Sequence, residues 1–165
     1  MYNNWVNRSE ISSNLFNPAF LSEVIRIYGK EYVSISNSSG FQFESLAIAM
    51  PLILDKRIRE SLPKTKSTKF HQWIQENGPI LVDFHSKAQA ILPFLREAIV
   101  FSVNHEVIDI SDKGEFTVVR LRKPRYWHGM LDETVDIFKA AKFVGKWNRT
   151  FPSKRIVFAL LGVKP

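Results

Sequence analysis

The chain has 165 residues, of which 45% are hydrophobic and 24% charged, and it carries a formal net charge of +7. This length fits one domain with a sizeable core. Because cysteine is absent, disulfide frameworks, thiolate metal sites and cysteine nucleophiles are excluded. The longest apolar runs, at 46–54 and 156–163, are far shorter than the roughly 20 residues that span a bilayer. Residues 1–10 are polar and lack a signal-like segment, so we expect a cytoplasmic protein.

The N-terminal part is predicted to be an arm followed by a helix. The arm covers residues 1–14. Asn17 and Pro18 form a cap and a first helical position, and apolar residues then recur at helical spacing. Gly29 is typical of a helix end. A short strand is predicted at 32–35, before a serine-rich turn.

Two long apolar segments follow, at 41–62 and 80–101, and both are predicted to be helical. Each contains a proline, Pro51 in the first and Pro93 in the second. Because proline removes a hydrogen bond and clashes with the preceding turn, each predicts a kink or a break. A short helix that carries Trp73 is predicted between the two segments.

The character of the sequence changes after the second segment. Two β-prone runs, 107–110 and 116–121, flank the turn 111–114 and predict a hairpin. A long helix is predicted at about 131–147, with acidic residues in its first half and basic residues in its second, as the helix dipole favours. The run 155–163 is rich in β-branched residues and predicts a terminal strand.

The predicted fold class is therefore mainly α with a β-hairpin, a single α+β domain over residues 1–165. Its helical part covers 15–104, and the hairpin, the long helix and the terminal strand occupy 105–165. The order of helices followed by a hairpin also resembles that of a winged helix, an order that many folds share.

No pattern of catalytic or ligand-binding residues stands out. The sequence contains no G-x-S-x-G elbow and no glycine-rich phosphate loop, and no histidine pair has the spacing of a helical zinc motif. We therefore predict no catalytic residues, no cofactor and no metal. The four histidines to which this applies are His71, His85, His105 and His128.

Basic clusters are the remaining candidates for a binding site. They lie at 56–69, at 120–125 and along the long helix at Lys139, Lys142 and Lys146. A basic loop and a hairpin end suit contacts with phosphates, while a solvated surface or ion pairs with a protein partner is the alternative for each cluster. The candidates for DNA contact are Lys64, Lys66, Arg120, Arg122, Lys123 and Arg125.

Four stretches of the chain, read together, resemble a known family. They are NPAF at 17–20, the block 50–77, FVGKW at 143–147 and ALLGVKP at 159–165. These stretches resemble the middle component of bacterial three-component ABC systems, a group that includes Lamassu-type anti-phage defence. The resemblance covers about 7–165, and its strongest part is the central block, with its order of Pro, Arg-Glu-Ser, Lys-x-x-x-Phe and Trp.

The resemblance implies a non-catalytic scaffold or adaptor subunit. Such a subunit would link an SMC- or Rad50-like ABC ATPase, expected as a dimer, to an effector that is often a nuclease. It would hold the effector inactive until foreign or abnormal DNA is sensed, and DNA would reach it through the complex. The positions that the resemblance marks as interaction or structural elements are Arg57, Arg59, Glu60, Lys69, Trp73 and Trp147.

Alternatives remain open at this point. Trp73 and Trp147 are interface anchors in one interpretation and packed core residues in the other. A second hypothesis for the whole protein is a stand-alone winged-helix DNA-binding regulator that uses Arg120 and Arg122. A third is an enzyme whose site is assembled in space from distant residues.

Overall fold

The computed structural model describes residues 16–35, 38–120 and 129–163. Within these ranges the chain is mainly helical and contains one antiparallel hairpin, so the predicted α+β fold class is confirmed. The elements in chain order are α2 (Pro18–Ile35), α3 (Phe43–Leu54), α4 (Lys56–Ser61), α5 (Phe70–Glu76), α6 (Gly78–Leu81), α7 (Phe84–Asn104), β1 (Ile108–Ile110), β2 (Phe116–Val118), α8 (Asp132–Trp147), the 3-10 turn η2 (Asn148–Thr150) and α9 (Lys154–Leu160).

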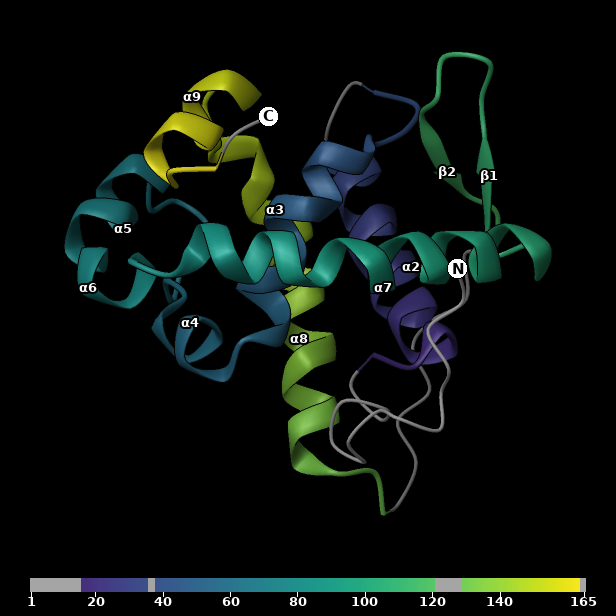
Figure 1. Cartoon of the computed structure of the whole chain (residues 1–165), viewed down its shortest axis with the longest axis horizontal. Helices are drawn as coiled ribbons and strands as arrows, with labels where there is room; N and C mark the ends of the chain where they lie inside the picture. The colour runs from purple at the N-terminus through teal and green to yellow at the C-terminus, as the bar shows by residue number, and fades with distance from the viewer. Residues whose placement is uncertain (1–15, 36–37, 121–128, 164–165) are drawn as a thin grey trace.

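Helices α2, α3, α7 and α8 form the centre of the fold. Helix α2 packs against both α7 and α8, and α3 packs against the same two helices. Figure 1 shows α7 crossing the view and α8 running steeply to it, with α4, α5, α6 and α9 gathered at one end. The fully buried residues that these central helices contribute include Leu21, Val24, Ile25, Leu46, Met50, Leu95, Ala98, Ala141 and Val144.

The cap predicted at the start of α2 is present. The side chain of Asn17 accepts a hydrogen bond from the backbone N–H of Ala19 at 2.8 Å, and the helix begins at Pro18. An Asn before a Pro at the first helical position satisfies one free N–H and places the proline where no N–H is needed.

Helices α2 and α8 approach each other closely at Gly145. A Cβ atom at this position would lie 2.6 Å from the carbonyl oxygen of Tyr28 and 2.9 Å from the Cβ of Glu31. The contact is fixed nearby by Asn148, whose side-chain amide donates to the Tyr28 hydroxyl at 2.9 Å. Only glycine therefore permits this distance between the two backbones.

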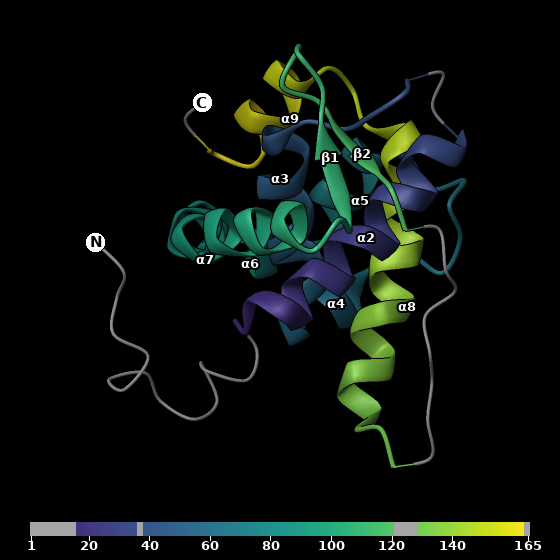
Figure 2. The same cartoon turned by 90° about the vertical axis from the view of Figure 1, so that its right-hand side faces the viewer.

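The predicted hairpin is also confirmed. Strands β1 and β2 are antiparallel, with Ile108 opposite Val118 and Ile110 opposite Phe116. Phe41 adds an isolated bridge to Phe116, closed by backbone hydrogen bonds of 3.0 and 2.7 Å. Strand β1 contacts α7 and β2 contacts α2, and Figure 2 shows the hairpin extending from this corner of the molecule.

The strand predicted at 32–35 is wrong, because α2 continues without interruption to Ile35. Gly29 does not end the helix and is buried inside it. A Cβ at Gly29 would lie 2.3 Å from the ring of Phe41. The glycine is therefore explained by close packing of the bridge segment against the helix, a cause that the local sequence does not reveal.

The predicted terminal strand is likewise wrong, because residues 154–160 form helix α9. Val157 and Leu161 are buried, while Ile156 and Leu160 face outward. Burial at positions four apart is the helical period, so packing decides against the β-branched composition of this segment. Gly162, with a φ of 66°, follows the helix.

The two internal prolines do not mark the helix breaks. Helix α3 runs through Pro51 and ends before Asp55, whose side chain accepts from the backbone N–H of Ile58 at 3.0 Å and caps α4. Helix α7 runs through Pro93, and the break in this segment lies at 82–83 instead. The capping residue, rather than the proline, sets the boundary between α3 and α4.

Candidate partner-binding surfaces

A loop rich in lysine connects α4 to α5. We call residues 62–69 the basic loop. The side chains of Lys64, Lys66 and Lys69 in it are exposed, as candidates for contact with a partner or with DNA must be. The hydroxyls of Thr65 and Ser67 form a hydrogen bond of 2.9 Å within the loop.

Two buried tryptophans hold this loop at its two ends. The indole N–H of Trp73 donates to the carbonyl of Ser61 at 2.7 Å, and that of Trp147 donates to the carbonyl of Thr68 at 2.7 Å. Trp73 is 2% exposed and Trp147 is 0% exposed. Of the two interpretations left open by the sequence, packing inside this chain is therefore the one observed for both residues.

The tryptophans belong to an aromatic cluster that joins α5 to α8. The rings of Trp73 and Trp147 meet edge to face, with centroids 5.3 Å apart. Phe70 lies 5.4 Å from Trp147 and 3.9 Å from Phe151 by ring centroids. Such pairs stabilise beyond the area they bury, by about 0.5–1.5 kcal/mol each. The basic loop thus rests on a rigid support.

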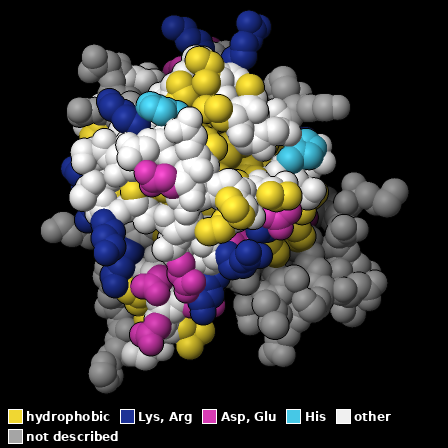
Figure 3. Space-filling model, turned by 90° about the vertical axis from the view of Figure 1, so that its left-hand side faces the viewer, with side chains coloured by type: hydrophobic (Ala, Val, Ile, Leu, Met, Phe, Trp, Pro, Cys, Tyr) yellow, Lys and Arg dark blue, Asp and Glu magenta, His cyan; other side chains and the backbone are white. Residues whose placement is uncertain are grey.

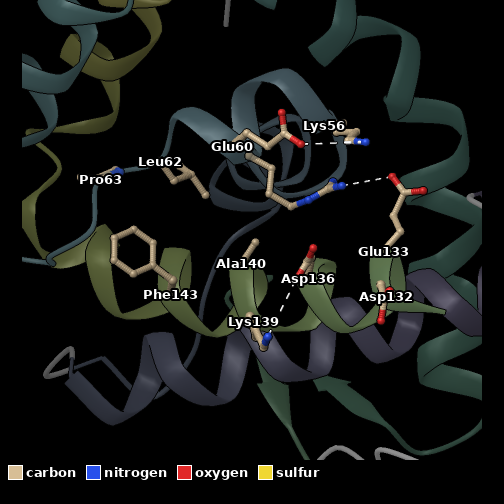
Figure 4. A pocket seen from close by; sticks show the side chains of 11 residues that line it. Lys56, Glu60, Leu62, Pro63, Asp132, Glu133, Asp136, Lys139, Ala140 and Phe143 are labelled. Carbon is tan, nitrogen blue, oxygen red and sulfur yellow. Dashed lines mark hydrogen bonds and ion pairs between the residues drawn. The ribbon is translucent and has the colours of Figure 1, made fainter. Parts of the chain in front are cut away.

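A groove of about 610 Å³ lies between α4 and α8 (Figure 4), and we call it the α4–α8 groove. Its walls carry both signs of charge, from Lys56 and Glu60 on one side and from Asp136 and Lys139 on the other. Lys56 pairs with Glu60 at 3.9 Å and Lys139 with Asp136 at 3.8 Å. Exposed pairs of this kind contribute little to stability, so they are free to exchange for charges of a partner.

Arg59 lines this groove, and its side chain is only 7% exposed. Its Nη1 donates to the carbonyls of Ile53 and Leu54 at 2.9 and 3.0 Å, which are end groups of α3. Its Nη2 donates to Glu133 of α8 at 3.1 Å. Arg59 therefore satisfies the end of one helix and fastens α4 to α8.

Replacing Arg59 by alanine is expected to lower the free energy of unfolding by about 1–2 kcal/mol, because two helix-end carbonyls lose their donor. Arg57 is the matched control, since it lies on the same helix and is exposed. Its alanine variant is expected to change stability by less than about 0.5 kcal/mol. Urea unfolding of both variants measures the difference. Equal effects would show that Arg59 does not hold the α3 end.

A partly exposed ion-pair cluster fixes the start of α4 to α7. Lys87 lies 2.9 Å from a carboxylate oxygen of Asp55 and 3.1 Å from one of Asp83. Burial raises the pKa of Asp55, but the hydrogen bonds from Lys87 and from the Ile58 N–H outweigh it and leave the pKa below its ordinary value. Burial lowers the pKa of Lys87, but its hydrogen bonds to the two carboxylates leave that pKa raised. The pair is therefore charged at neutral pH.

The other predicted positions are either exposed or outside the residues that the structure describes. Arg57 and Glu60 are exposed on α4, and Arg120 is exposed after β2. The carbonyl of Arg120 accepts from the buried guanidinium of Arg26 at 3.3 Å, which holds the end of the hairpin against α2. Arg122, Lys123 and Arg125 lie outside the described residues.

A second hollow, of about 630 Å³, was not foreseen as a unit by the sequence. We call it the lysine hollow. It combines the basic loop with the end of α8 and with η2, and these segments are about eighty positions apart in the chain. The residues that line it are Ile35, Thr65, Lys66, Ser67, Lys69, Lys146 and Thr150.

Apolar side chains gather on the face that α5, α6 and α9 form. Figure 3 shows this face, with hydrophobic side chains between charged groups. Ile156 and Leu160 of α9 are 48% and 44% exposed, and Val82, which follows α6, is 85% exposed. We call Ile156 and Leu160, which lie one turn apart on α9, the apolar end. Exposed apolar groups that gather on one face are typical of protein–protein contact sites.

The described ranges contain neither a metal-binding cluster nor a membrane-spanning helix. No group of three or more His, Asp or Glu side chains there is placed to hold a metal ion. No helix in those ranges has the length and hydropathy that crossing a bilayer requires.

Comparison with known sequences and structures identifies a family for this chain. No curated protein and no solved structure matches the chain. A family described as ABC-three component (ABC-3C) system Middle Component 3 matches residues 5–165, which is nearly the whole sequence and includes the basic loop, the α4–α8 groove and the aromatic cluster. The chain therefore belongs to the Middle Component 3 family of ABC-three component systems.

Proposed function

We propose that this protein is a non-catalytic adaptor that joins the ABC ATPase of its system to the effector. The observation that carries the proposal is the match to a middle component over residues 5–165. A middle component works with other subunits, so its function lies in the surfaces that it offers them. The resemblance noted from the sequence supports an SMC- or Rad50-like ATPase and a nuclease effector as the two partners.

Two surfaces of different chemistry support an adaptor role. The α4–α8 groove offers ion pairs that can be exchanged for charges of a partner; Glu60 lines it, and Arg57 is exposed on the same helix, α4. The apolar end offers Ile156 and Leu160, which lose contact with water when a partner covers them. Distinct surfaces on different helices allow one subunit to hold two partners at once.

Co-expression with the ABC ATPase and the effector of the same system tests this proposal. Size-exclusion chromatography with mass determination is expected to show one complex that contains all three proteins. Arg57→Glu is expected to weaken the contact with one partner, and the double change Ile156→Asp and Leu160→Asp the contact with the other.

Matched controls separate these effects from unfolding. Arg96→Glu makes the same charge change at an exposed position of α7, and Val100→Asp places the same carboxylate at another exposed apolar position of that helix. Both controls are expected to leave the complex intact. A monomer that elutes beside unbound ATPase and effector would contradict the adaptor role and would favour the DNA-binding regulator.

A further inference from the structure

The lysine hollow brings cations from distant segments to one concave surface. Lys66 and Lys69 come from the basic loop, and Lys146 comes from the last turn of α8. Hydroxyl groups lie between them, from two loop residues and from η2. The polar residues that line the hollow are Thr65, Lys66, Ser67, Lys69, Lys146 and Thr150.

Contacts with Trp147 and Glu31 hold this arrangement in place. Trp147 follows Lys146 directly, and its indole N–H donates to the carbonyl of Thr68, next to Lys69. Lys146 is itself placed by Glu31, with 3.3 Å between the charged groups. The ammonium of Lys146 and the backbone that carries Lys69 are therefore positioned before any ligand arrives, which lowers the entropy lost on binding.

The chemistry of the lining suits phosphate groups. Lysine is a compact point charge that binds phosphates, and serine and threonine hydroxyls donate to phosphate oxygens in protein–nucleic acid contacts. None of the residues that line the hollow is acidic, and the nearby carboxylate of Glu31 is already paired with Lys146.

The size of the hollow favours a chain of phosphates over a single one. A volume of about 630 Å³ holds on the order of twenty water molecules, far more than one phosphate group displaces. Lys64 is exposed on the same loop but is not among the lining residues, so the positive surface continues past the hollow. A polymer with regularly spaced phosphates engages such cations together.

We propose that the lysine hollow binds the sugar–phosphate backbone of a nucleic acid. Because only charged and hydroxyl groups make the contacts, the binding is independent of base sequence. It goes beyond the adaptor role and does not require it, since the hollow is formed by this chain alone. It also differs from a wing-based contact, which would use the hairpin and Arg120.

Fluorescence anisotropy of the full chain with a labelled duplex of about 20 base pairs, between about 50 and 200 mM salt, tests the proposal. The test variant carries Lys66→Ala and Lys69→Ala. We expect its affinity at low salt to fall about tenfold or more and the slope of log affinity against log salt to fall by about two, one for each lysine.

The control variant carries Lys113→Ala and Lys154→Ala. It loses the same two positive charges, from the turn of the hairpin and from the start of α9, both exposed and both outside the hollow. We expect its affinity to stay within about twofold of the parent. A third variant with Lys66→Arg and Lys69→Arg keeps the charges and is expected to restore binding.

Several outcomes would overturn the proposal. A parent protein that does not bind the duplex at low salt would end it, and so would equal loss in the test and control variants. Displacement of the duplex by inorganic phosphate at equal phosphate concentration would indicate a single-phosphate site. Displacement by polyglutamate at equal charge would indicate an acidic protein partner. None of these outcomes bears on co-elution with the ATPase, so the two proposals fail independently.

Discussion

The variant Trp147→Ala is expected to lose about 3–5 kcal/mol of unfolding free energy, the range for an aromatic side chain removed from a packed core. Trp147 is fully buried and contacts aromatic rings from α5, α8 and the segment after η2. The change also removes the donor to Thr68, so the basic loop loses its attachment to α8. Urea unfolding followed by far-UV circular dichroism measures the loss.

The variant Trp147→Phe separates packing from the hydrogen bond. It keeps an aromatic ring but has no N–H for the carbonyl of Thr68, and we expect it to lose about 1–3 kcal/mol. In both variants trypsin is expected to cleave faster after Lys64 and Lys66, because the loop is released. Unchanged cleavage together with reduced stability would mean that Trp147 supports the core but does not hold the loop.

The variant Gly145→Ala is expected to lose about 2–3 kcal/mol, although alanine is the better helix former by about 1 kcal/mol. The added methyl group would lie 2.6 Å from the backbone carbonyl of Tyr28, and a backbone atom in the middle of a helix cannot turn aside. Helices α2 and α8 would have to separate. Thermal unfolding, with a lower Tm than the parent, measures this effect.

Gly78→Ala is the matched control for this prediction. Gly78 also lies in a helix, α6, and a Cβ there would meet no atom within 4 Å. We expect its stability to stay unchanged or to rise by less than about 1 kcal/mol. If Gly145→Ala is as stable as Gly78→Ala, the close approach of α2 and α8 is not a constraint on the fold.

Sequence reasoning succeeded where local chemistry sets the structure. Asn17 and Pro18 define the start of α2 by capping, and Gly114, with a φ of 73°, serves the turn between two β-prone runs. It failed where packing decides. Gly29 has the sequence signal of a helix end, yet it lies inside α2 because the ring of Phe41 leaves no room for a side chain. Residues 154–160 have a strand-like composition, yet they form a helix that buries one face.

In the candidate surfaces, too, some features are visible in the sequence and others arise only from packing. The sequence alone groups Lys66 with Lys69, because the two lysines are close together in the chain. Their association with Lys146 depends on the packing of α8 against the basic loop, which no spacing rule gives. Arg59 had the same sequence signal as Arg57, but its two helix-end carbonyl partners become visible only in three dimensions.

The two indole groups that hold the basic loop belong to α5 and α8, and both bond to backbone carbonyls. A backbone carbonyl is present whatever side chain its residue carries, so these two hydrogen bonds do not depend on the side chains of the loop. The loop can therefore diverge in side-chain chemistry while its path stays the same. For protein engineering, this makes the exposed residues 64–67 a position where new side chains can be displayed while both attachments to the scaffold are kept.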